Sequence, residues 1–146
     1  MASGRFAMAV HALALLAHGE DGAPSEYLAG SVNTHAVFLR RVLRQLAAGG
    51  LIEAREGRGG GYRLARPAAA ITLAEVYRAM EPDGPLTPSP CEPNDKCPVG
   101  AGMRAAFDQT AAAARAGVEA ALSAQTVADV ARTALRRGKR AAVTTT

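Results

Sequence analysis

The feature that most constrains this chain is a glycine-rich, arginine-studded turn at residues 55–64, Arg-Glu-Gly-Arg-Gly-Gly-Gly-Tyr-Arg-Leu. Two short runs of strand-like composition, 51–54 and 61–65, frame the turn. Glycine adopts the left-handed conformations that a tight hairpin requires and lets the backbone approach another molecule closely. The pattern therefore predicts a two-stranded hairpin with Arg58 at its tip.

The segment before this hairpin is expected to form a helix with one apolar and one cationic face. Its apolar residues follow the i, i+3, i+4, i+7 spacing of a buried helix face: Leu39, Val42, Leu43 and Leu46. The arginines between them point away from the core: Arg40, Arg41 and Arg44. Asn33 or Thr34 is expected to cap this helix, which ends near Ala48 because two glycines follow.

Apolar periodicity predicts two helices upstream of the basic one. The first covers 5–17, and its buried face is expected to contain Phe6, Val10, Leu13 and Leu16 or Ala17. The second opens at Pro24 and is expected to stop at Gly30, because glycine is a poor helix former. Three helices followed by a hairpin indicate a winged helix-turn-helix, in a chain that is mainly α.

Three more helices are expected downstream of the hairpin. Thr72 and Glu75 stand at capping-box spacing and predict a helix to about residue 81. A helix over 98–122, about 24 residues and ~36 Å long, would outrun a small core and is expected to form a homodimer interface. A last helix over 126–135 precedes a basic tail that is predicted to be disordered.

These elements divide the chain into four segments. A winged-helix domain is predicted at 1–81, followed at 82–97 by a proline-rich loop that holds both cysteines and could serve as a sensor. A dimerisation unit is predicted at 98–137 and a disordered basic tail at 138–146.

Net charge and composition limit the kinds of binding partner that the chain is expected to have. The 146 residues carry a formal net charge of +4, and the cations cluster in 40–66 and 132–140, which favours an anionic partner. A basic balance alone would also suit a membrane surface. No apolar run reaches the roughly 18 residues that span a bilayer, and no secretory leader is recognisable, so a cytoplasmic protein without a membrane partner is expected.

Double-stranded DNA is the partner that helix, hairpin and charge predict together. A recognition helix places its N-terminal residues at base edges in the major groove, while arginines further along it contact phosphates. Arginine at a wing tip can enter the minor groove, where negative potential concentrates. The predicted DNA contacts are Thr34, His35, Arg40, Arg41, Arg44, Arg55, Arg58, Gly59, Gly60, Tyr62 and Arg63. The alternative is a solvated basic helix beside an ordinary hairpin.

Cys97 is the candidate sensor residue. Pro98 suits the first position of the long helix, which makes Cys97 its N-cap, where the helix dipole and neighbouring Lys96 favour a thiolate with a lowered pKa. Cys91 lies six residues upstream and could resolve an oxidised Cys97 into a disulfide. An oxidant or small molecule is thus a candidate effector. The alternative is that both are incidental loop cysteines.

Four segments carry a resemblance to a known family. They are Ser31 to Thr34 leading into 39–43, the stretch Gly-Gly-Gly-Tyr-Arg-Leu-Ala-Arg-Pro at 59–67, Ile-Thr-Leu at 71–73, and Cys-Pro-Val-Gly at 97–100. The chain resembles the Rrf2 family of bacterial transcriptional regulators. That resemblance implies a dimeric winged helix-turn-helix repressor or activator whose long C-terminal helix forms the dimer interface.

Several members of that family bind an iron-sulfur cluster through three cysteines. This chain has Cys91 and Cys97, but Met103 stands at the third position. A thioether is a poor substitute for a thiolate on iron. The Cys-Pro-Val-Gly signature instead resembles the YwnA-like branch, which binds no cluster. No cofactor or metal is therefore expected.

These patterns predict that the protein is a homodimeric repressor that binds a palindromic operator. They also predict that it responds to oxidants or electrophiles through Cys97. One alternative is a regulator of the same fold that senses a small ligand or an iron-sulfur cluster. Another is a protein-interaction module that docks a metabolic enzyme. Enzyme activity is not expected, because neither a phosphate loop with its lysine nor paired carboxylates beside a histidine occur.

Overall fold

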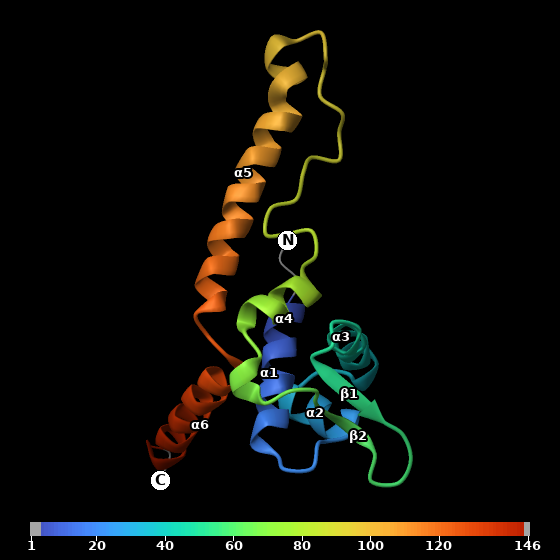
Figure 1. Cartoon of the computed structure of the whole chain (residues 1–146), viewed down its shortest axis with the longest axis vertical. Helices are drawn as coiled ribbons and strands as arrows, with labels where there is room; N and C mark the ends of the chain where they lie inside the picture. Colours follow the sequence, from blue (N-terminus) through green and yellow to red (C-terminus); the bar gives the residue numbers. More distant parts are fainter. Residues whose placement is uncertain (1–3, 145–146) are drawn as a thin grey trace.

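A computed structural model describes residues 4–144 and shows a helical body from which one long helix projects (Figure 1). The described elements are α1 (Arg5–His18), α2 (Ser25–Val32), α3 (Ala36–Ala48), β1 (Ile52–Arg55), β2 (Gly61–Leu64), the 3-10 turn η1 (Ala68–Ala70), α4 (Leu73–Met80), α5 (Pro98–Ser123) and α6 (Val127–Thr144). This order confirms the predicted mainly helical winged helix-turn-helix with a two-stranded wing.

Helix α1 lies at the centre of the body and packs against α2, α3, α4 and α6. Its buried face consists of Ala9, Ala12, Leu13 and Leu16, whereas Phe6 and Val10 of the predicted face are only partly buried. The alanines let neighbouring backbones approach closely, so neighbours cover more than one side of the helix. Helix α3 buries Leu39, Val42, Leu43 and Leu46 in the same core, as its spacing predicts.

The turn between α2 and α3 differs from the prediction. Helix α2 continues through Gly30 and ends at Asn33, whose φ of 60° is left-handed. Asparagine tolerates that conformation, while a glycine inside a helix costs only about 1 kcal/mol and need not end it. Asn33 and Thr34 therefore do not cap α3. His35 takes the N-cap position, without a hydrogen bond from its side chain.

The wing is an antiparallel pair in which Ile52 faces Leu64 and Arg55 faces Gly61. Two backbone hydrogen bonds tie it to the turn before α2: the Ala23 amide donates to the Tyr62 carbonyl at 2.9 Å and the Tyr62 amide donates to the Ala23 carbonyl at 2.8 Å. The hairpin is thus anchored to the body at its second strand.

Helix α4 begins with the predicted capping box. The Glu75 amide donates to the Thr72 hydroxyl at 3.3 Å, and the Thr72 amide donates to the Glu75 carboxylate at 2.9 Å. The hydrogen bond from the Thr72 backbone is the largest cause of the lowered pKa of Glu75, and Arg66, 2.7 Å away, adds to it. Both interactions favour the carboxylate form of the side chain.

Helix α5 forms an arm. It starts at Pro98 with Cys97 as N-cap, as predicted, and none of its 26 residues is buried. The 82–97 loop runs beside it (Figure 1). At the base of the arm, Glu119 lies 3.5 Å from both Arg78 of α4 and Arg115. No helix within residues 4–144 combines the length and apolarity needed to cross a membrane.

The C-terminal segment corrects a second expectation. Helix α6 runs to Thr144, so residues 138–144 continue a helix and are not disordered, while 145–146 lie outside the described residues. Val127 is fully buried beside the core, and its amide donates to the Ile71 carbonyl at 2.9 Å. Alanine, arginine and lysine are strong helix formers, and the one interior glycine, Gly138, does not end the helix.

Two wing glycines make a matched test of this anchoring. A Cβ at Gly61 would lie 2.5 Å from the Ala23 carbonyl oxygen, whereas a Cβ at Gly57 would meet no atom within 4 Å; both residues have positive φ. Gly57→Ala is expected to cost about 1 kcal/mol of unfolding free energy from conformation alone, and Gly61→Ala more than about 2 kcal/mol. Urea denaturation measures both, and equal losses would contradict the anchoring.

Candidate functional site

The exposed face of α3 gathers the cations predicted from the sequence. Arg40, Arg41 and Arg44 are all exposed, on the side of the helix opposite the buried leucines. His35 is exposed at the N-cap, and Thr34 before it is half-buried. A helix with one side anchored in the core and the other cationic can enter a groove of DNA without distorting the fold.

Two apolar side chains on α3 were missed by the sequence reasoning. Val37 is 62% exposed and Phe38 is 44% exposed, both in the first turn of the helix. Val37 shares the i, i+4, i+7 spacing with Arg41 and Arg44, so the same periodicity that places the arginines could have found it. An exposed apolar side chain among cations is suited to contact the methyl group of thymine in the major groove.

The wing residues divide into a free tip and a paired base. Arg55 and Arg58 are exposed, and Gly59 lies beside Arg58 with a φ of 76°. Arg63 forms an ion pair with Glu53 on the facing strand at 3.0 Å. Both side chains are about half exposed, so the pair contributes at most about 1 kcal/mol to the free energy of unfolding. Arg63 can therefore leave Glu53 and bind a DNA phosphate at small cost.

Gly60 and Tyr62 have structural roles in the wing. A Cβ at Gly60 would collide with the carbonyl oxygens of Arg55 and Gly57, so glycine is required there to close the turn. Tyr62 is half-buried against the core, and its backbone carries the two hydrogen bonds to Ala23. The structure therefore turns both residues inward and leaves Arg58 as the cation at the tip.

A groove on the inner side of the wing mixes charges. Glu20 and Asp21 of the α1–α2 turn line it together with Arg55 and Arg63. Two carboxylates beside two guanidinium groups lower the positive potential at this position. The arginines of α3 and Arg58 consequently dominate the positive field of the candidate interface.

Cys97 caps α5 from a tightly folded loop. The backbone amides of Gly100 and then Val99, in the first turn of α5, lower the pKa of the Cys97 thiol because they favour the thiolate. The lowering by the start of the helix agrees with the prediction, whereas the Lys96 ammonium, which was expected to add to it, is not among the causes. The thiol is fully exposed.

Asn94 holds the chain in position before the cap. Its carbonyl accepts from the Cys97 amide at 3.2 Å, and its side-chain oxygen accepts from the Lys96 amide at 3.0 Å. The Asn94 carbonyl lies where a Cβ of residue 100 would be, so only glycine fits there. The Cys-Pro-Val-Gly sequence thus has a steric explanation.

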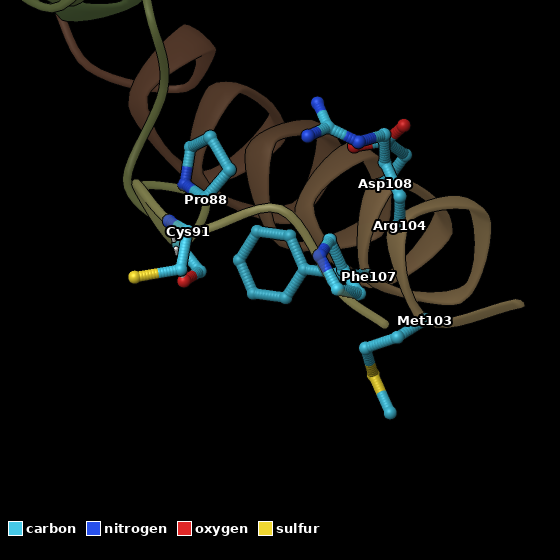
Figure 2. Close-up of a pocket in the computed structure, with 8 residues that line it drawn as sticks. Pro88, Cys91, Met103, Arg104, Phe107 and Asp108 are labelled. Atoms are coloured by element: carbon cyan, nitrogen blue, oxygen red, sulfur yellow. Dashed lines mark hydrogen bonds between the residues drawn. The ribbon is translucent and has the colours of Figure 1, made fainter. Parts of the chain in front are cut away.

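Cys91 lines a small pocket between the loop and α5, with a volume of about 160 Å³. Pro88 and Phe107 form its apolar walls, and the Cys91 sulfur is directed away from the Phe107 ring (Figure 2). An ion pair between Arg104 and Glu92, at 2.6 Å, ties the loop to the arm. The pocket can admit a small apolar molecule.

The residues around this loop offer two thiols to an iron-sulfur cluster, Cys91 and Cys97. Met103, at the third family position, is 46% exposed and offers a thioether in place of a thiolate. Within residues 4–144, no group of three His, Cys, Asp or Glu side chains is arranged to hold a metal ion. The donor set is therefore short of the four good ligands that such a cluster requires.

The cap geometry predicts the reactivity of Cys97. In a Cys91→Ser background, the iodoacetamide rate should rise with pH through a midpoint that is lower in the folded protein than in the denatured chain, because the lowered pKa yields thiolate at lower pH. Gly100→Ala should move the midpoint upward by displacing Asn94 and the cap. Identical midpoints for folded and denatured protein would contradict the cap.

Comparison with known proteins agrees with this architecture. Residues 2–133 match the family model Rrf2, described as an iron-dependent transcriptional regulator. YwnA of Bacillus subtilis, which carries the name of an HTH-type transcriptional regulator, is 35% identical over 130 residues, covering 89% of this chain and 96% of YwnA. A structure from Lactobacillus plantarum, assigned as a transcriptional regulator, matches with a TM-score of 0.73 and 25% identity over 94% of this chain and 98% of its own.

CymR (YrzC), called the global cysteine regulator of B. subtilis, shares the fold with a TM-score of 0.65 at 24% identity, covering 91% of this chain and 97% of CymR. The family match spans the winged domain, the cysteine loop and the arm. The protein is therefore a transcriptional regulator and not an enzyme, and it belongs to the Rrf2 family.

Proposed function

We propose that this protein is a homodimeric repressor that reads a palindromic operator in double-stranded DNA. Helix α3 would lie in the major groove, and the wing would reach the adjacent minor groove through Arg58. The observation that carries this proposal is the two-sided character of α3, whose leucines are buried while Arg40, Arg41 and Arg44 are exposed. An acidic protein partner fits less well, because protein interfaces seldom contain such an excess of one charge.

The proposed dimer is supported by the exposure of α5. This helix is about 39 Å long at 1.5 Å per residue and has no buried side chain. Two of its large apolar side chains are exposed, Val99 to 66% and Met103 to 46%. Apolar side chains on a projecting helix gain stability when a second copy covers them. Two copies joined along α5 would set two α3 helices about one helical turn, ~34 Å, apart. Such a dimer on a promoter sterically excludes polymerase, which favours repression.

The proposed signal acts on Cys97, without an iron-sulfur cluster. Its thiolate attacks a hydroperoxide: an S–O bond forms, the O–O bond breaks, and the alkoxide or hydroxide leaves as the protonated alcohol or water. The Cys91 thiol then attacks the sulfenic acid, forming a disulfide and releasing water. Because Cys97 caps α5, this change alters the start of the dimer helix and the separation of the two α3 helices.

A small apolar ligand in the pocket beside Phe107 is the second candidate signal. The pocket joins the loop to α5, so an occupant would act on the same helix. The observation that favours it is the apolar lining, which is independent of the Cys97 thiol.

Removal of the wing-tip cation tests the DNA interface. With an operator duplex obtained by in vitro selection, Arg58→Ala should weaken binding and lower the salt slope by about one unit, because one phosphate would no longer be neutralised. Arg104→Ala on the arm removes the same charge far from the wing and should leave both values unchanged. Fluorescence anisotropy across salt concentrations measures them. A salt slope unaffected by Arg58→Ala would remove the wing tip from the interface.

Operator binding before and after hydroperoxide treatment tests the thiol signal. Oxidised wild type is expected to bind about tenfold or more weakly, within the usual range of allosteric coupling, while Cys97→Ser should not respond. Cys91→Ser should accumulate the sulfenic acid, seen by mass spectrometry as one added oxygen. An equal response of wild type and Cys97→Ser would rule out this thiol as the switch.

A further inference from the structure

The basic character of the chain resides in its last helix. Residues 132–146 hold five cations and no carboxylate, whereas the rest of the chain has 12 cations against 13 carboxylates. The net charge of +4 is therefore the sum of a near-neutral regulator and a strongly cationic end segment. The interface formed by α3 and the wing does not use this charge.

The cations lie on one side of α6. Its apolar residues, including Val127, Ala131 and Leu135, face α1 and the core. The cations of its second half are all exposed: Arg136, Arg137, Lys139 and Arg140. The helical spacing places the three arginines away from those apolar residues, whereas Lys139 stands beside Leu135 at the edge of the hollow between α6 and α1. We call these four residues the α6 cationic face.

No carboxylate neutralises this face within the part of the chain that the structure describes. The nearest ion pair on the helix joins Arg132 to Asp129 at 3.3 Å, one turn before the face begins. Four unpaired cations within five positions, about 6 Å along the helix axis, repel one another. They form a local positive field that a polyanion would relieve.

The α6 cationic face lies on a different side of the body from α3. Helix α1 packs against both helices, and Figure 1 shows α6 and α3 on opposite sides of α1. One subunit therefore cannot place both faces on the same short stretch of duplex. The polyanion at α6 must be a stretch beyond the half-site that α3 would read.

We propose that the α6 cationic face is a second DNA surface, which binds phosphates without reading sequence on a duplex segment outside the operator. The proposal rests on the proposed function, because a regulator seated on an operator is surrounded by flanking DNA. Point charges without base-directed partners contribute affinity but no sequence preference. A membrane surface fits less well, because Leu135 and Val143 are the only large apolar side chains exposed on the described part of α6, too few for a face that inserts into lipid.

Two DNA duplexes of different length test binding to the operator and to its flanks separately. The short one holds only the selected operator, about 20 base pairs, and the long one adds flanks of mixed sequence to about 60 base pairs. The variant R136Q/R137Q/K139Q/R140Q should match wild type on the short duplex, because glutamine preserves the helix. On the long duplex it should bind about tenfold or more weakly, with a salt slope lower by up to about 3.6 per subunit.

Four further variants accompany the test. R136K/R137K/R140K keeps the charge and should bind like wild type. R136Q/R140Q should weaken binding to the long duplex, while K96Q/R104Q, which removes two cations from the far end of the arm, should not. R40Q/R44Q on α3 should lose the short operator. Circular dichroism and thermal midpoints establish that each variant is folded.

The outcomes distinguish the proposal from the function on which it rests. If R40Q/R44Q loses the operator and the quadruple variant equals wild type on both duplexes, the α6 surface fails alone, and an acidic protein becomes the better partner. An equal loss on both duplexes would place α6 at the operator itself and also overturn the proposal. If R40Q/R44Q binds the operator normally, the proposed role of α3 fails.

Discussion

Burial of α1 is the constraint on which the rest of the structure depends. Its small and branched apolar residues, Ala9, Ala12, Leu13 and Leu16, lie in contact with helices from both ends of the chain. Because α3 packs on one side of this helix and α6 on another, their exposed faces point in different directions. The same packing that stabilises the body therefore separates its two cationic surfaces.

The surfaces differ in chemistry as well as direction. On α3 the arginines stand beside an exposed valine, and a wing held by Ala23 and Tyr62 carries Arg58 nearby. On α6 the charges stand alone, with no carboxylate after Asp129. A mixed apolar and cationic face suits the reading of base edges, whereas a cluster of cations without base-directed partners suits contacts with phosphates.

The arm links the cysteine loop to this body through its base, which packs against α4. Glu119 connects α5 to Arg78, while the other end of the helix is held by the turn around Asn94 and by the Arg104–Glu92 pair. The Cys97 cap stands at the distal end of this arm, so chemistry there could reach the DNA-binding body only through the helix or a second copy.

The structural features that the sequence predicted correctly are those determined by residues close together in the chain. The two faces of α3, the glycine turn of the wing, the Thr72–Glu75 capping box and the Cys97–Pro98 start of α5 depend on spacing within a few residues. The same helical periodicity places Val37 on the exposed side of α3, with Arg41 and Arg44. The family assignment followed from the same local motifs and is confirmed over most of the chain.

Only the tertiary structure decided the features that depend on distant neighbours. The left-handed Asn33, the Arg63–Glu53 pair, the inward Tyr62 and the opposing positions of α3 and α6 arise from contacts between separate elements. The end of α6 was predicted to be disordered because its composition is basic and polar, yet Val127 and its neighbours pack against the core and anchor a helix that continues to Thr144. Beyond Ala131 the described residues of α6 are all exposed, so the helix continues to Thr144 because its first turns are anchored by packing and the residues that follow are mostly strong helix formers.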